Sequence, residues 1–116
     1  MKYYAAVATD DGKIVNLHFG RCGKFLTAEI DTDTNEISVL GATTVRPACL
    51  AEHEEDAFDE IAALLSDCKF IIAARAGLAA KRYMKAKGLI ILEDSQLVDD
   101  ALKTLLFHLR ATEKGL

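Results

Sequence analysis

The stretch KFIIAA, residues 69–74, decides the fold, because after its first lysine this short apolar run lies between two segments with helical periodicity. Residues 52–66 before it carry apolar side chains on one stripe and acidic side chains in the first turns, as an amphipathic helix does. Residues 77–87 after it predict a second helix, which Gly88 ends. Another apolar run, residues 89–92, follows and indicates a second strand joined to the first by a helical crossover.

Three further strands are predicted before this unit, and one helix after it. Residues 3–9 form an apolar run that ends at a turn, and residues 25–31 and 36–45 flank a turn-rich segment typical of an antiparallel hairpin. Ser95 is expected to cap a last helix, whose apolar side chains recur every three or four positions as far as Leu109.

The predicted order is therefore β-β-β-α-β-α-β-α, in a single domain over residues 1–116. A hairpin meander followed by crossovers implies an α/β fold with a mixed five-stranded sheet and three helices. The ribonuclease H-like motif, with sheet order 3-2-1-4-5, meets these requirements. The loops after the first, third and fourth strands then emerge at one edge of the sheet, where the strand order reverses and leaves a crevice for a ligand.

The bulk composition limits the possible functions. The 116 residues are 51% hydrophobic and contain a single proline, which is typical of one compact core.

Residues 48–68 hold seven acidic and no basic side chains, whereas residues 69–92 hold six basic and no acidic ones. These segments are either two solvated helix faces or a basic surface for an anionic ligand or partner. The net charge of −4 disfavours nucleic acid as that partner. Neither a membrane span nor a signal pattern is found, so we expect a cytoplasmic protein.

The three cysteines, Cys22, Cys49 and Cys68, have irregular spacing that does not suggest a disulfide framework. In a reducing compartment they remain thiols, free to pack or to bind metal. Cys68 precedes the apolar strand of residues 69–74 and is expected in the core.

The long loop after the first strand contains the sequence HFGRCG, residues 18–23. Long loops in compact domains are usually functional or mobile. Here His18 offers an imidazole, Cys22 a thiolate, and Arg21 and Lys24 positive charge, while Phe19 and Phe25 are expected to pack beneath the loop.

Two other loops are predicted to reach the same edge. Cys49 and His53 are four residues apart and would share a helix face if that helix starts early. Arg75 precedes a helix whose free N–H groups favour anions. The candidate cofactor-binding residues are His18, Arg21, Cys22, Lys24, Cys49, His53 and Arg75, and the candidate metal ligands among them are His18, Cys22, Cys49 and His53.

The sequence TDDGKIVNLHFGRC of residues 9–22, together with His53-Glu54-Glu55-Asp56 and the segment entering the last strand at Gly88, carries a family resemblance. It resembles the dinitrogenase iron–molybdenum cofactor biosynthesis family, which includes the NifX and NafY carriers and the C-terminal domain of NifB. The resemblance covers most of the chain, and the His-Phe-Gly loop is its most specific part.

This resemblance implies a ribonuclease H-like protein of nitrogen fixation that binds an iron–sulfur precursor or the finished iron–molybdenum cofactor. Such proteins hold the cluster between its synthesis and its insertion into dinitrogenase, so the implied partners are cluster donor and acceptor proteins. His18 stands at the position of the family's expected ligand. The chain departs from the family at Ala74-Arg75-Ala76-Gly77, where nitrogenase-type members carry a glycine-rich turn; Arg75 could supply charge there instead.

Three alternatives remain beside the carrier. His18, Cys22, Cys49 and His53 could form a structural zinc site with two cysteines and two histidines. A regulatory interaction module of the same fold would need no loop ligand. A nuclease would need acidic residues within the first strand, and residues 3–8 contain none. We therefore expect a carrier rather than an enzyme.

Overall fold

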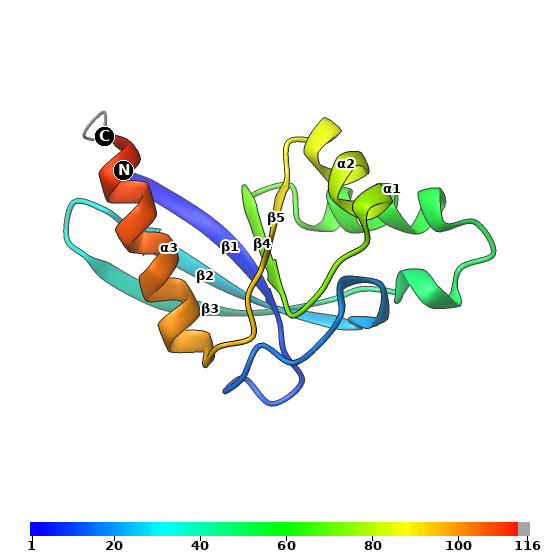
Figure 1. Cartoon of the computed structure of the whole chain (residues 1–116), viewed down its shortest axis with the longest axis horizontal. Coiled ribbons are helices and arrows are strands. Elements are labelled where there is room, and N and C mark those ends of the chain that lie inside the picture. The colour runs from blue at the N-terminus through cyan, green and yellow to red at the C-terminus, as the bar shows by residue number, and fades with distance from the viewer. Residues whose placement is uncertain (114–116) are drawn as a thin grey trace.

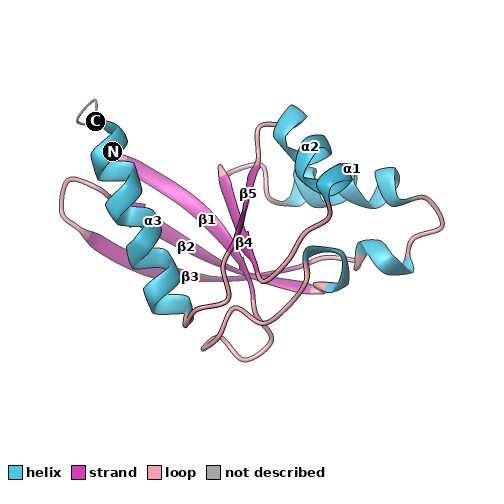
Figure 2. Cartoon of the chain, in the orientation of Figure 1, coloured by secondary structure: helices cyan, strands magenta, loops and turns pink. Residues whose placement is uncertain are grey.

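A computed structural model describes residues 1–113 of the chain. Five strands, three α-helices and two short 3-10 helices follow one another in the predicted α/β order (Figures 1 and 2). In chain order they are β1 (Lys2–Ala8), η1 (Phe19–Arg21), β2 (Lys24–Asp31), β3 (Glu36–Thr44), η2 (Ala48–Leu50), α1 (Glu54–Leu64), β4 (Phe70–Ala73), α2 (Leu78–Ala86), β5 (Ile90–Glu93) and α3 (Val98–Glu113).

The five strands form one mixed sheet in the order β3-β2-β1-β4-β5, which confirms the predicted topology. β1 pairs antiparallel with β2 and parallel with β4, and β5 pairs parallel with β4. The chain therefore leaves β1, β3, β4 and β5 at the same edge of the sheet. The ribonuclease H-like classification stays a prediction.

The helices cover both faces of the sheet, and the alternating side chains of β1 show how the faces are divided. Ala6 and Ala8 belong to a core cluster with residues of α1 and α2, whereas Ala5 and Val7 belong to a cluster with residues of α3. All four are fully buried. Small residues on the central strand let helices from both sides approach the sheet closely.

The helix ends agree with the sequence in one case and differ in another. Gly88 has a φ of 89°, the left-handed conformation that glycine adopts readily, and it follows the last turn of α2 as predicted. The predicted cap at Ser95 is wrong, because α3 begins only at Val98. The chain first makes a turn in which the Asp94 carboxylate accepts a hydrogen bond from the Gln96 N–H (3.0 Å).

None of the helices within residues 1–113 combines the length and the apolar character needed to cross a membrane.

The core predicts a clear difference between two aliphatic residues of α1. Ile61 is fully buried in the cluster beneath α1 and α2, whereas Leu64 is 48% exposed. Ile61→Ala should lower the free energy of unfolding by about 2–5 kcal/mol, because a cavity is left in a packed core. The control Leu64→Ala should lower it by less than about 1 kcal/mol. Urea unfolding followed by circular dichroism measures both; equal losses would contradict this packing.

Candidate functional site

The site is built where β1 and β4 stop pairing. Their last paired residues are Val7 and Ile72, and the returning loop enters the gap beyond them. There the Leu17 N–H donates to the Ala8 carbonyl (3.3 Å) and the Leu17 carbonyl accepts the Ala74 N–H (3.0 Å). Residues of the loop thus sit between the diverging strand ends, at the point where the strand order reverses.

His18 follows directly and is held by the same backbone pattern. It forms a parallel bridge with Arg75, in which the Phe19 N–H donates to the Arg75 carbonyl (2.9 Å). Its side chain is exposed. The backbone of His18 is therefore fixed beside the ends of β1 and β4, while its side chain stays exposed.

Phe19 anchors the loop from below. It is 1% exposed, and its ring lies 6.1 Å from that of Phe25 and 5.7 Å from that of Phe58, measured between centroids. The expectation that Phe19 and Phe25 pack beneath the loop is confirmed. The buried ring of Phe19 thus holds the segment next to His18, whose own side chain stays exposed.

The first part of the loop is also tied down, although its length alone suggested mobility. The Asp11 carboxylate accepts hydrogen bonds from the N–H groups of Lys13 (2.8 Å) and Ile14 (3.1 Å), and these bonds lower the pKa of Asp11. The Lys13 carbonyl accepts the Val98 N–H at the start of α3 (2.8 Å). Local and long-range hydrogen bonds therefore preorganise the loop that carries His18.

The loop after β3 lies beside this one. The Val45 N–H donates to the Gly23 carbonyl (2.9 Å), and η2 packs against η1. Cys49, in η2, is exposed. His53 is exposed too but immediately precedes α1, so Cys49 and His53 do not share a helix face. The condition for a shared face, an early start of that helix, is not met, because a separate 3-10 turn takes up residues 48–50 and α1 begins at Glu54.

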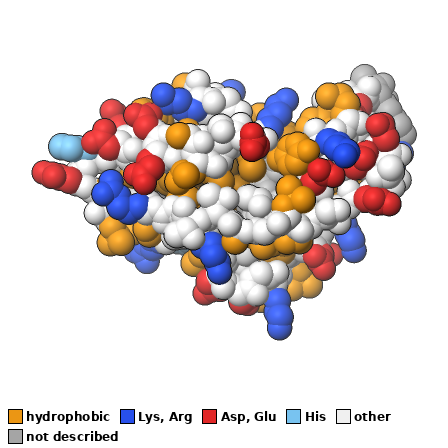
Figure 3. Space-filling model, turned by 180° about the vertical axis from the view of Figure 1, so that it is seen from behind, with side chains coloured by type: hydrophobic (Ala, Val, Ile, Leu, Met, Phe, Trp, Pro, Cys, Tyr) orange, Lys and Arg blue, Asp and Glu red, His pale blue; other side chains and the backbone are white. Residues whose placement is uncertain are grey.

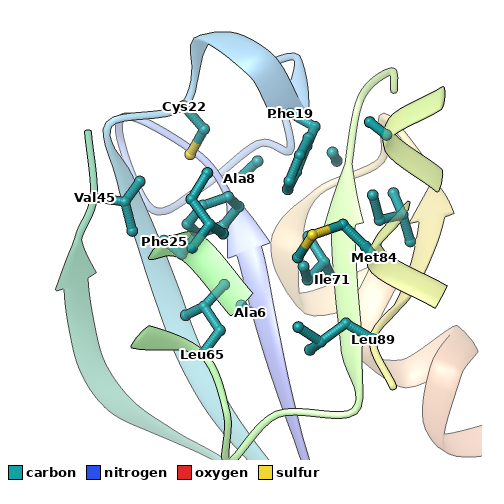
Figure 4. Close-up of a cluster of buried hydrophobic side chains, with 14 of the residues drawn as sticks. Ala6, Ala8, Phe19, Cys22, Phe25, Val45, Leu65, Ile71, Met84 and Leu89 are labelled. Carbon is teal, nitrogen blue, oxygen red and sulfur yellow. The ribbon is translucent and has the colours of Figure 1, made fainter. Parts of the chain in front are cut away.

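Cys22 does not lie where a ligand role requires it. Its side chain is fully buried, and Figure 4 shows its sulfur pointing into the cluster that contains Phe25 and Val45. The thiol donates a hydrogen bond to the Lys24 carbonyl (3.0 Å), and burial raises the pKa of Cys22 to about 11. A metal would need the thiolate at the surface, so in this conformation Cys22 is a core residue. Cys68, also buried, is in the core as expected.

A carboxylate that the sequence reasoning missed lies at this edge. Glu93, the last residue of β5, contacts the Lys81 ammonium and accepts a hydrogen bond from the Ala76 N–H (3.4 Å). These interactions, led by Lys81 and assisted by the charge of Arg75, lower the pKa of Glu93. β5 runs parallel to β4, so the two strands end at the same edge of the sheet. An acidic residue at the end of β5 was therefore the sequence signal that could have placed Glu93 at this site. Glu93 thus places a carboxylate of the protein itself in the region where Arg75 was expected to attract an anionic ligand.

The exposed donors near this loop do not assemble into a metal site by themselves. Among residues 1–113, His, Cys, Asp and Glu side chains nowhere gather in groups of three or more that could hold a metal ion. The alternative zinc site is therefore not assembled. An exposed imidazole can instead complete the coordination of a metal that is already bound by sulfide. Arg21, Lys24 and Arg75 are exposed and provide positive charge on the same loops.

Comparison with known sequences agrees with the predicted resemblance. The family model for the dinitrogenase iron-molybdenum cofactor matches residues 1–106. The FeMo cofactor biosynthesis protein NifB of Chlorobaculum tepidum is 25% identical over 99 residues, which make up 85% of this chain and 23% of NifB. The chain thus spans about a quarter of the length of that relative.

Solved structures share the fold. The apo form of the orange protein from Desulfovibrio gigas is 19% identical with a TM-score of 0.63, over 90% of this chain and 88% of that one. The crystal structure of PH0822 is 22% identical with a TM-score of 0.65, over 93% and 90% of the two chains. At these identities the likeness concerns the fold alone.

The cysteines give a direct test of this site geometry. Iodoacetamide at about pH 8 should modify Cys49 quickly, because it is the exposed thiol, while Cys22 and Cys68 should react only after unfolding. Mass spectrometry of the intact protein should show one rapid addition, and Cys49→Ser should abolish it. Equally fast modification of Cys22 would mean that the loop opens readily.

Proposed function

Because this chain belongs to the dinitrogenase iron–molybdenum cofactor family, whose members take part in the biosynthesis of that cofactor, we propose that it binds a metal–sulfur cluster as cargo. The cluster is the iron–molybdenum cofactor or an iron–sulfur precursor of it. One observation carries the proposal: the backbone of His18 is fixed between the ends of β1 and β4 while its side chain stays exposed.

The chemistry of such a cluster suits a site with few ligands. Bridging sulfide already occupies most coordination positions of its metals, so one imidazole can bind an exposed metal at the surface of the cluster. Cys49, exposed on the neighbouring η2, is the second candidate ligand. His53 is exposed near it and stays a candidate, whereas buried Cys22 does not fit the ligand set of this conformation.

Positive charge complements the imidazole. Metal–sulfur clusters of this kind are anions, and exposed Arg21, Lys24 and Arg75 favour them at the loop edge. Glu93 opposes this attraction, since it already engages Lys81 and the Ala76 N–H. Attraction by the basic side chains and repulsion by Glu93 together favour a moderate affinity for the cluster. A carrier needs such an affinity in order to take a cluster from a donor protein and release it to an acceptor.

The proposed role is therefore that of a non-catalytic, cytoplasmic carrier in cofactor assembly. Its partners are the cluster itself and the donor and acceptor proteins of nitrogenase assembly.

The ligand role of His18 predicts a selective loss of binding. His18→Ala, mixed anaerobically with isolated iron–molybdenum cofactor, should weaken binding at least about tenfold, because the imidazole that binds the exposed metal is gone. Absorbance and EPR titrations measure the binding.

His108→Ala is the matched control, because His108 is also exposed but lies on α3. It should bind as the unmodified protein does. Equal binding by His18→Ala and the unmodified protein would refute the ligand assignment, provided that circular dichroism shows both folded.

The opposing charge of Glu93 predicts a gain. Glu93→Gln removes this carboxylate charge, which frees Lys81 and leaves the charge of Arg75 unopposed, so the same titration should show binding tightened by a few-fold. Glu36→Gln is the control, because Glu36 is an exposed carboxylate at the start of β3. Weaker binding by Glu93→Gln would show that Glu93 supports the site rather than competing with the cargo.

A further inference from the structure

The strand β5 lies at the opposite edge of the sheet from β3, and the order of the sheet gives it β4 as its one neighbour among the described residues. The Ile90 N–H donates to the Lys69 carbonyl (2.9 Å), and the Asp94 N–H donates to the carbonyl of the last β4 residue (2.9 Å), so both N–H groups face β4. Because backbone groups alternate along a strand, Ile91 and Glu93 direct their N–H and C=O groups outward. In the part of the chain that the structure describes, these four groups have no strand partner, and they offer a template for another strand.

A hollow of about 480 Å³ lies between β5 and α3. α3 packs mainly over β2 and leaves part of β5 uncovered on this face of the sheet, where Ile90 is 37% exposed (Figure 1). Ligand pockets usually measure roughly 300–1,000 Å³, so the hollow is large enough to receive side chains of a chain laid along β5. Its floor is apolar and is formed by Phe70, Ile72, Leu92, Leu105 and Leu109.

Charged side chains mark the two ends of this hollow. Lys69 lies at one end, one residue before the first pair of β4 and β5, and Asp94 lies at the other, one residue after their last pair. Five residue steps along β5 separate these two levels, which is about 16 Å at about 3.3 Å per step.

The charges of Lys69 and Asp94 are not compensated within the protein. Neither side chain has an ion-pair partner among the described residues, whereas Glu93, next to Asp94, already engages Lys81. On the surface seen from behind in Figure 3, acidic and basic side chains are mixed. In the hollow, by contrast, one uncompensated charge of each sign occupies its own end.

We infer that β5 binds the C-terminal segment of a partner protein, about five residues long, as an added antiparallel strand. Such a segment spans the distance between the charged ends of the hollow. Antiparallel pairing places its terminal carboxylate beside Lys69 and a basic residue at its start beside Asp94, so both charges are compensated. Its backbone pairs with Ile91 and Glu93, and every second side chain, on the same face as Leu92, enters the hollow.

The end of α2 explains why a chain terminus fits better than a continuing chain. Leu89 is the next residue in the outward row, and its N–H already donates to the Met84 carbonyl of α2 (2.9 Å). Pairing along β5 therefore stops beyond Ile91 at the level of Lys69. The same obstruction disfavours a second copy of this protein, because after Asp94 its chain would have to continue past this point toward α3.

Titration of the unloaded, ¹⁵N-labelled protein with the peptide KLTLV, followed by NMR, tests the inference without any cluster. The peptide starts with a basic residue, has leucines at alternate positions and ends in a free carboxylate. We expect a Kd below about 1 mM, with the largest shifts at the amides of Ile91 and Glu93.

Two altered peptides separate the contributions to binding. The same peptide with a C-terminal carboxamide should bind at least about fivefold more weakly, because Lys69 loses its anionic partner. The peptide KLPLV should bind at least about tenfold more weakly, because the proline lacks the N–H that pairs with the outward groups of Ile91.

Two protein variants test the charged end and the hollow. Lys69→Glu should weaken binding of KLTLV at least about tenfold and leave binding of the carboxamide peptide nearly unchanged. Thr104→Trp should weaken both peptides, because Thr104 is exposed and lines the hollow, which the larger side chain fills. Lys103→Glu and Lys103→Trp are the matched controls, because Lys103 is exposed on α3 outside the hollow, and neither should change the Kd.

Three results would overturn the inference. The first is the absence of shifts at Ile91 and Glu93 with KLTLV at about 2 mM, a concentration above the expected Kd. The second is equal binding of KLTLV and KLPLV, which would exclude strand pairing. The third is a dimer of the protein alone, seen by sedimentation equilibrium and dispersed by Thr104→Trp, which would show that a second copy occupies the hollow.

Discussion

The insertion of Leu17 between the diverging ends of β1 and β4 is the constraint on which the site depends. Two parallel strands that separate leave backbone groups unpaired, and the returning loop satisfies those of Ala8 and Ala74. The same insertion forces His18 into register with Arg75 and directs Phe19 into the core. One local hydrogen-bonding requirement of the fold therefore fixes the backbone of His18 at this edge of the sheet and leaves its side chain exposed.

This coupling explains how a site with few ligands can be well ordered. The loop bonds to the turn before α3 through Val15 and Gln96 and packs on the core through Phe19, so binding a cargo need not order the loop first. The charged side chains around the loop then set the affinity of the proposed site for its cluster. In the proposed site, the exposed arginines are the groups that attract an anionic cluster, and the Glu93 carboxylate near the start of α2 opposes that attraction.

The fold could be predicted from the sequence because its signals are local and consistent. The apolar run of residues 69–74 and the hairpin turn at residues 31–35 determine the order of the sheet. The site could be predicted only in part. Sequence spacing indicated His18 and Arg75 at one edge, but the burial of Cys22 depends on how the loop turns after η1. Likewise the separate 3-10 turn at η2, which parts Cys49 from His53, and the pairing of Glu93 with Lys81 are tertiary outcomes without a strong local signal.

Pulsed EPR of the cluster-loaded protein, prepared with ¹⁵N-labelled histidine, tests the central claim most directly, because the chain contains only three histidines. Direct coordination predicts a hyperfine coupling between the cluster and an imidazole nitrogen, with a frequency that changes between the ¹⁴N and ¹⁵N samples. A paramagnetic cluster that is bound but gives identical spectra for both samples would contradict ligation by His18.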